Sequence, residues 1–198
     1  KLRFPYLSEH FATGREIHPE RVRPRLERVR SGTWQADLFK LASLTWSVPV
    51  SPGFGRRLRY LVWDDSNQRL MGILAIGDPV FNLRSRDDYI GWTGEQRRSQ
   101  LVHIMDAYVL GAVPPYNQLL GGKIVASLLR TKEIFDDFEA AYGAREGIIS
   151  GKVKQARLAA ITTTSSMGRS SVYNRLKLGK EFHLRPIGYS SGYGHFHI

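Results

Sequence analysis

Residues 107–123 have the sequence AYVLGAVPPYNQLLGGK, and this stretch indicates the class of fold. The unbroken apolar run over 107–113 is typical of a buried strand, which the two prolines after it end. The Gly121-Gly122 pair then introduces a helix that we expect to reach Leu129. A buried strand, a glycine loop and a helix in this order predict a protein of the α/β (α+β) class.

The sequence before this stretch predicts an antiparallel hairpin. Residues 58–63 alternate in polarity, residues 64–67 (Asp-Asp-Ser-Asn) are typical of a turn, and a second apolar run covers 70–76. The other expected elements are a helix from a Thr93–Gln96 capping box through Met105, an amphipathic helix from Ile134 to Gly143, a strand over 157–164, a short helix over 170–178 and a final hairpin over 182–198.

The N-terminal part predicts helices. Pro19 suits a first helical turn, and apolar residues recur at 22, 26 and 29, although Pro24 would kink such a helix. Five arginines surround this stripe and would face either DNA or solvent. A second helix is expected from Ser31 or Thr33 through Leu44. We therefore expect a basic helical extension over 1–52 and an α/β core over 53–198.

Composition excludes several classes of protein. The 198 residues include no cysteine, which excludes disulfides, thiolate metal sites and cysteine catalysis. The absence of an apolar run of about 18 residues predicts that the chain does not cross a membrane. The first residues, which lack an initiator methionine, resemble neither a signal peptide nor a transit peptide, so a cytoplasmic location is expected.

Positive charge is concentrated at the two ends of the chain. The net charge is +11, with +7 over residues 1–59, −3 over 60–146 and +7 over 147–198. A domain this basic usually binds a polyanion, most often nucleic acid. The alternative is a general bias towards arginine that improves solubility.

From residue 107 onward the order of elements resembles the Gcn5-related N-acetyltransferases. In that superfamily a loop of the form [Arg/Gln]-x-x-Gly-x-[Gly/Ala] opens a helix and binds the pyrophosphate of acyl-CoA. Gln118 and Gly121 match this pattern and Gly122 follows, whereas Lys123 replaces the second small residue. The resemblance implies a fold of mixed sheet flanked by helices, and Tyr173 as a general acid.

Several longer motifs are specific enough to indicate a family. They are Gly-x-Gly-Arg-Arg at 53–57, Gly-Asp-Pro-Val at 77–80, Arg-Asp-x-aromatic-Ile-Gly-Trp at 86–92, the run from Thr163 to Leu176, and Ile-Gly-Tyr-Ser-Ser-Gly-Tyr-Gly at 187–194. These motifs resemble the DruA family of Druantia anti-phage defence systems. The resemblance implies a role in phage defence and other defence-system proteins as partners.

Basic residues in loops are the candidate contacts to nucleic acid. Arginine binds phosphate through paired N–H groups, and a serine at a helix start adds further donors. Each segment has a plainer explanation as well: a solvated hairpin end at 56–59, and a serine helix cap beside a surface arginine at 169–170. The candidates are Arg56, Arg57, Arg59, Arg86, Arg169, Ser170, Arg175 and Lys177, with Gln118, Gly121, Gly122 and Lys123 as an anion loop.

Carboxylates in the middle segment raise a second possibility. Arg86 and Asp87 most simply form a structural ion pair, but Asp78, Asp87 or Asp88, and Asp106 could also converge as metal ligands of a nuclease. Asp87 is therefore retained as a candidate catalytic residue beside Tyr173. His195 and His197 share one face of an expected strand, and two ligands do not make a metal site.

The leading hypothesis is a nucleic-acid-binding component of an anti-phage system, with DNA favoured over RNA. An acyl-CoA-dependent N-acetyltransferase is the first alternative and a metal-dependent nuclease the second. No metal site is predicted. No cofactor is expected, except acetyl-CoA under the acetyltransferase alternative.

Overall fold

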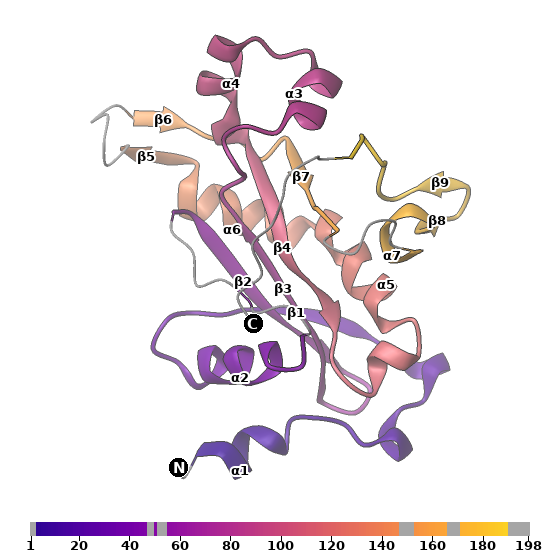
Figure 1. The fold of residues 1–198 in the computed structure, drawn as a ribbon. Helices are drawn as coiled ribbons and strands as arrows, with labels where there is room; N and C mark the ends of the chain where they lie inside the picture. The colour runs from indigo at the N-terminus through magenta and orange to yellow at the C-terminus, as the bar shows by residue number, and fades with distance from the viewer. Residues whose placement is uncertain (1–2, 47–49, 51–54, 147–152, 166–170, 190–198) are drawn as a thin grey trace, which may run out of the picture.

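The computed structural model describes residues 3–46, 50, 55–146, 153–165 and 171–189 (Figure 1). Within these ranges the main sheet has five strands in the order β1-β2-β3-β4-β7, flanked by helices. The expectation of a mixed α/β fold is thus confirmed. The strands of the main sheet are β1 (Pro24–Arg28), β2 (Arg57–Asp64), β3 (Arg69–Gly77), β4 (Ile104–Ala112) and β7 (Ala160–Thr162).

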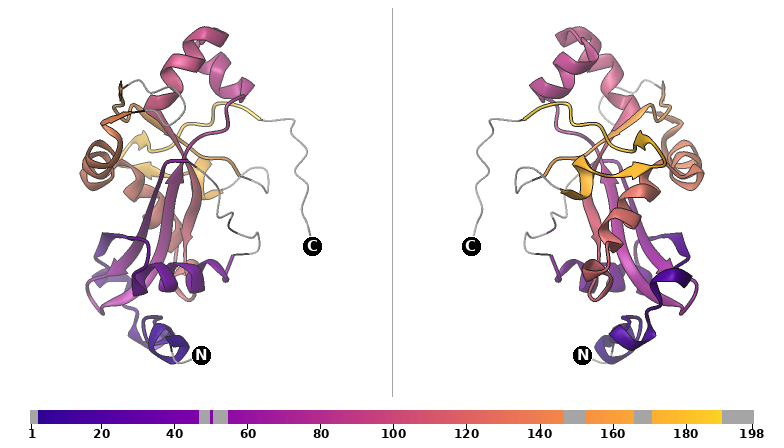
Figure 2. Two further views of the ribbon diagram at one scale, coloured as in Figure 1. Left: turned by 90° about the vertical axis from the view of Figure 1, so that its left-hand side faces the viewer. Right: turned by 90° about the vertical axis from the view of Figure 1, so that its right-hand side faces the viewer.

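Helices and two small sheets complete the described part of the chain (Figure 2). The α-helices are α1 (Arg3–Ser8), α2 (Trp34–Ser43), α3 (Arg84–Ile90), α4 (Gly94–Gln100), α5 (Gly121–Ser127), α6 (Lys132–Tyr142) and α7 (Ser171–Asn174). Short 3-10 turns lie at Gly14–Glu16, Pro19–Arg21, Leu101–His103, Tyr116–Gln118 and Leu128–Arg130. The small sheets pair β5 (Ala144–Glu146) with β6 (Val153–Gln155) and β8 (Lys177–Leu178) with β9 (Glu181–Phe182).

The sheet has an apolar core on each face. Side chains of β2 and β3 on one face, such as Tyr60 and Leu74, pack with Val125 of α5 and Phe138 of α6. Those on the other face pack against α2, where Phe39 is buried. Because strand residues alternate between faces, β2 supplies both cores and is buried along most of its length.

The hairpin β2–β3 confirms the predicted pairing, and a buried carboxylate closes it. Asp64 is fully buried at the end of β2. Its Oδ1 accepts hydrogen bonds from the backbone N–H groups of Arg23 and Ser66, both at 3.0 Å. Its Oδ2 accepts one from the Tyr116 hydroxyl at 2.8 Å. Asp64 thereby connects the β2–β3 turn with the chain before β1 and with the loop after β4.

Two glycines allow α5 to lie close to the sheet. A Cβ atom at Gly72 of β3 would stand 2.6 Å from the Gly111 carbonyl oxygen and 2.7 Å from a Val125 methyl group. A Cβ atom at Gly121 would stand 2.5 Å from the Tyr116 carbonyl oxygen. The crossover through α5 and α6 then brings β7 alongside β4 in parallel, with Ile104 opposite Ala160.

The helix predicted over 19–30 is wrong. Residues 19–21 form a 3-10 turn, and β1 pairs antiparallel with β2 at the edge of the sheet. Pro24 is the first residue of β1, a position where a strand tolerates a missing N–H. The predicted boundary at residue 52 stays a prediction, although β1 joins the sheet of the core.

Other differences concern where elements begin and end. The capping box of Thr93 and Gln96 is present, but its helix ends at Gln100, and Met105 belongs to β4. Residues 83–92, which show no clear period, contain α3. The strand predicted over 157–164 is three residues long. For the hairpin predicted over 182–198, the expected turn at 190–192 lies outside the described residues.

Candidate nucleic-acid interface

A basic groove of about 520 Å³ lies where β1 ends and β2 begins. Half of its lining residues are arginines, two from the end of β1 and the residues after it, and two from β2. We call this the arginine groove. It is lined by Arg28, Val29, Arg30, Ser31, Gly55, Arg57, Arg59 and Tyr142.

Backbone hydrogen bonds hold the walls of the arginine groove together. The N–H of Val29 donates to the Arg59 carbonyl oxygen at 2.8 Å, which continues the β1–β2 pairing beyond the strand. The Tyr142 hydroxyl at the end of α6 accepts from the Arg57 N–H at 2.8 Å and donates to the Arg57 carbonyl at 2.9 Å. Three separate elements are therefore fixed around one basic surface.

The two arginines of β2 lie over aromatic rings. Arg57 stacks 4.7 Å from the centre of the Tyr108 ring, and its Nη1 is 3.3 Å from the Tyr108 hydroxyl. Arg59 lies 5.8 Å from the centre of the Phe39 ring. Burial raises the pKa of Tyr108, and the positive charges of Arg57 and Arg59 act in the opposite direction. Stacking orients these guanidinium groups without neutralising them.

Few carboxylates balance this charge. Arg28 pairs with Asp137 of α6 at 3.0 Å. Arg30 is exposed, Arg59 is half-buried, and neither pairs with a carboxylate among the residues that the structure describes. Within the described ranges, the charges of Arg30 and Arg59 are thus not neutralised by a carboxylate, which is the arrangement that phosphate groups favour.

Arg56 does not belong to this surface, although it was predicted together with Arg57 and Arg59. Its Nε donates to Asp78 at 2.6 Å, and its two terminal nitrogens donate to the carbonyl oxygens of Val102 and Ile104. The side chain is 19% exposed and lies against the rings of α6. Its donors are already used inside the protein, so Arg56 fixes the start of β2.

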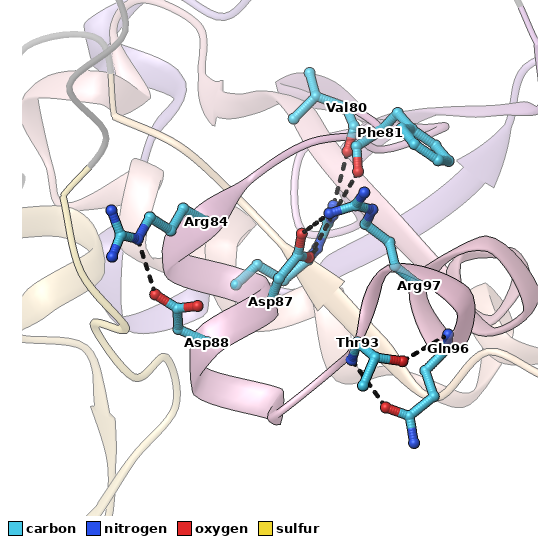
Figure 3. A network of polar contacts seen from close by, with 9 residues as sticks. Val80, Phe81, Arg84, Asp87, Asp88, Thr93, Gln96 and Arg97 are labelled. Carbon is cyan, nitrogen blue, oxygen red and sulfur yellow. Dashed lines mark hydrogen bonds and ion pairs between the residues drawn. The ribbon is translucent and has the colours of Figure 1, made fainter.

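Arg86 and Asp87 form a buried network rather than a surface (Figure 3). Arg86 is 0% exposed and donates to Asp87 Oδ1 at 2.7 and 2.8 Å and to the carbonyl oxygens of Val80 and Phe81. Arg97 of α4 donates to Asp87 Oδ2 at 3.0 Å. Contrary to expectation, Arg86 has no surface to offer a phosphate, and the simpler structural ion pair is the arrangement observed.

The electrostatics of Asp87 agree with a structural role. Burial alone would raise the pKa of its carboxyl group, but hydrogen bonds from Arg86 and Arg97 lower the pKa below its ordinary value. A carboxylate held ionised between two guanidinium groups is a poor proton donor or acceptor near neutral pH. Asp87 therefore joins α3 to α4, and its role as a candidate catalytic residue stays a prediction.

The carboxylates considered as metal ligands have separate partners. Asp78 binds Arg56, Asp87 binds Arg86, Asp88 binds Arg84, and Asp106 accepts from Thr162 at 2.7 Å. Within the described ranges, no three histidine, aspartate or glutamate side chains gather where they could hold a metal ion.

The glycine loop before α5 has a packing function. Leu120 has a left-handed backbone conformation, with a φ of 61°, and the space beside Gly121 is filled by the Tyr116 carbonyl. Gly122 faces more open space, with a Val172 methyl group 3.9 Å from the position of its missing Cβ. The Lys123 N–H donates to the Leu120 carbonyl at 2.9 Å. Gln118 is exposed at the end of a 3-10 turn.

Tyr173 belongs to α7, where the preceding residue, Val172, faces Gly122 at the start of α5. Burial raises the pKa of its hydroxyl group, a hydrogen bond with Thr163 opposes this, and the charge of Asp106 adds to it. Burial likewise raises the pKa of Asp106, with Thr162 and the charge of Arg86 acting against it. A tyrosine and an aspartate are thus close together beyond the last paired residues of β7.

Two further predicted residues, Arg175 and Lys177, do not line the arginine groove. Arg175 is exposed directly after α7, and Lys177 is exposed on β8, where it lies over the Phe182 ring at 4.4 Å. Arg169 and Ser170 lie outside the described residues. Tyr142 was missed as a site residue, and Arg28 and Arg30 were considered as facing DNA or solvent but were not among the candidate contacts. The arginines between 21 and 30 were the available signal, but a helix was assumed where the chain forms a strand.

The fold and the groove define a strongly basic α/β chain with a groove lined by arginines. Comparison with known proteins identifies its family. A family model described as Druantia protein DruA matches residues 2–198. The chain is also 66% identical over 197 residues to the Druantia protein DruA of Escherichia coli (strain UMEA 4076-1).

The chain therefore belongs to the DruA family, which confirms the resemblance to this family of Druantia anti-phage defence components. It spans about half the length of the relative that it matches, with 100% of this chain aligned to 49% of the other. No solved structure matches. In the described part of the chain, no helix combines the length and apolar character needed to cross a membrane.

Proposed function

We propose that this protein binds nucleic acid, DNA rather than RNA, through the arginine groove, as part of a Druantia anti-phage system. The single observation that supports the proposal is the groove itself, which four arginines line and in which neither Arg30 nor Arg59 pairs with a carboxylate of the described residues. The guanidinium groups of Arg57 and Arg59 are already oriented over aromatic rings, so little of their side-chain entropy remains to be lost when they bind phosphate. Other proteins of the same defence system are the proposed protein partners.

The salt dependence of the binding constant should report how many phosphate groups the protein contacts. We expect fluorescently labelled single- or double-stranded DNA to bind with an affinity that falls linearly on a log–log plot against salt. Each neutralised phosphate adds about 0.7–0.9 to the slope. Replacing Arg59 by alanine should weaken binding and reduce the slope by about one such increment. Fluorescence anisotropy at four or more salt concentrations measures both quantities.

Arg98→Ala is the matched control for this experiment. Arg98 is exposed on α4 and does not line the groove, so its removal changes the net charge equally and should leave the slope nearly unchanged. Absence of DNA binding at low salt would refute the proposal. Equal losses in the two variants would place the binding surface elsewhere.

An acyl-CoA-dependent N-acetyltransferase with a Gcn5-like core is the second candidate. It is favoured by the parallel β4–β7 pair that follows a crossover through α5, and by Tyr173 beside Asp106. If it is correct, acetyl-CoA at a hundred times its dissociation constant stabilises the fold by about 2.7 kcal/mol. A melting temperature unchanged by millimolar acetyl-CoA would count against it. The third possibility, a metal-dependent nuclease, gains no support, because the candidate metal-ligand carboxylates each pair with a different residue.

A further inference from the structure

We propose that the arginine groove recognises a terminal phosphate of a nucleic-acid strand, a phosphate monoester rather than the diester links along the strand. This inference rests on the proposed function and names the chemical group bound at the same site. Its basis is the size of the groove, the concentration of guanidinium groups around it and the identity of the groups that remain available to a ligand.

The first argument is size. A groove of about 520 Å³ lies within the range of about 300–1,000 Å³ that is typical of small-molecule sites. It suits one end of a strand better than the continuous surface that a duplex of many base pairs needs. Its walls are close together because the Val29–Arg59 and Tyr142–Arg57 hydrogen bonds join them.

The second argument is charge. Arg28, Arg30, Arg57 and Arg59 surround one small volume; Asp137 pairs with Arg28, and neither Arg30 nor Arg59 pairs with a carboxylate in the described part of the chain. A diester phosphate has a single negative charge and two unbridged oxygens. A monoester has a charge of about −1.5 to −2 at pH 7 and three acceptor oxygens. Several guanidinium groups around one position are therefore better satisfied by a monoester.

The third argument concerns which groups are available. Arg30 and Ser31 are exposed, and Arg59 is half-buried with its guanidinium over Phe39. The Tyr142 hydroxyl is already used in both directions by the backbone of Arg57. Recognition of the terminal phosphate is therefore assigned to Arg30 and Arg59, with Ser31 as a hydroxyl donor. The contacts between Arg57 and Tyr142 maintain the shape of the groove.

The test compares strands that differ only at their ends. Single-stranded DNA of one sequence and about 12 nucleotides, with an internal fluorophore, is prepared with a 5′-phosphate, with a 3′-phosphate, or with hydroxyl groups at both ends. In fluorescence anisotropy at 0.15 M salt, one phosphorylated strand should bind at least about tenfold tighter than the hydroxyl strand, the effect of one additional charged hydrogen bond. Whichever phosphate gives the tighter complex identifies the end that is bound.

Variants separate this inference from the proposed function. Arg59→Ala should reduce the preference for the phosphorylated strand, and Arg98→Ala should leave it unchanged. Equal binding of all three strands, with Arg59→Ala weakening each alike, would overturn the inference and leave the proposed function standing. Failure of every strand to bind would overturn both.

A pH series supplies a second readout. The second pKa of a phosphate monoester is near 6, whereas a diester has no such step. The groove is lined by arginines, one tyrosine and residues without an ionisable side chain, and Asp137 beside Arg28 is the adjoining carboxylate. Lowering the pH from 7.5 to 5.5 should therefore shrink the preference for the phosphorylated strand. A preference that does not change over this range would contradict recognition of a dianion.

Discussion

Replacing Arg86 by alanine is expected to lower the free energy of unfolding by about 3–5 kcal/mol, the usual cost of removing one partner of a buried ion pair. The substitution leaves Asp87, which is 6% exposed, with Arg97 as its remaining cationic partner. It also removes the donors to the carbonyl oxygens of Val80 and Phe81. Equilibrium unfolding in urea, followed by tryptophan fluorescence, measures the change.

The neighbouring residue Arg84 provides the control. Its pair with Asp88 is formed between side chains that are 93% and 70% exposed, so Arg84→Ala should have almost no effect on stability. Because Arg84 and Arg86 both lie in α3, the difference between the two variants reports the effect of burying the ion pair and not the effect of removing an arginine from this helix. If Arg86→Ala changes the free energy of unfolding by less than about 1 kcal/mol, the buried network does not hold α3 and α4 in place.

Asp64→Ala is expected to destabilise the fold by about 3 kcal/mol, because three buried or half-buried donors lose one acceptor group together. The Tyr116 hydroxyl is the most affected, since Tyr116 is 1% exposed and its hydroxyl donates to Asp64 while it accepts a hydrogen bond from the Asn67 amide. Tyr116→Phe is the matched variant, as it removes one donor and keeps the carboxylate. It should cost less than Asp64→Ala in the same unfolding experiment, and an equal or larger cost would contradict this account.

The same carboxylate makes stability depend on pH. Burial opposes ionisation of Asp64, but hydrogen bonds from Arg23, Ser66 and Tyr116 outweigh it and lower its pKa. Hydrogen bonds from Thr13 and Arg69 lower the pKa of Glu16 to about 2. Because both folded-state pKa values lie below the unfolded ones, their contribution is present above the ordinary pKa and is lost as pH falls through the folded value.

Thermal unfolding at pH 7, 4, 3 and 2.5 tests this dependence. The melting temperature should fall below about pH 4 in the wild type. Asp64→Asn, which cannot be protonated in this range, should begin from a lower melting temperature and decrease less steeply between pH 4 and 2.5. Parallel curves for the two proteins would assign the acid sensitivity to other groups.

Local patterns predicted the central elements of the sheet well. The β2–β3 hairpin has turn residues between two apolar runs, and the Thr93–Gln96 capping box predicted the start of α4. Their determinants are close together in the chain. The segment over 19–30 failed because apolar residues at 22, 26 and 29 fit a helix, while pairing with β2, a contact across some 35 residues, determines the outcome.

Only part of the candidate site could be predicted, because the contacts of each arginine depend on elements that are distant in the sequence. Arg57 and Arg59 were predicted as phosphate contacts because they are basic residues expected in a loop, and both line the arginine groove. Arg56 and Arg86 were predicted in the same group, but their donors are used inside the protein. Sequence reveals the charge of an arginine but not which carbonyl or carboxylate oxygens surround it, since those partners belong to other elements.

The parallel pairing of β4 with β7 also constrains the order of folding. Ile104 pairs with Ala160 although the whole crossover, with α5 and α6, separates them in the chain, whereas β2 and β3 are joined by a turn of a few residues. Hairpins form within about 1–10 μs, but a distant parallel strand must wait for the segment between to order. During synthesis, a nascent chain that ends before residue 160 has β4 as an open edge. We expect such intermediates to be the stage at which this protein is most prone to aggregate.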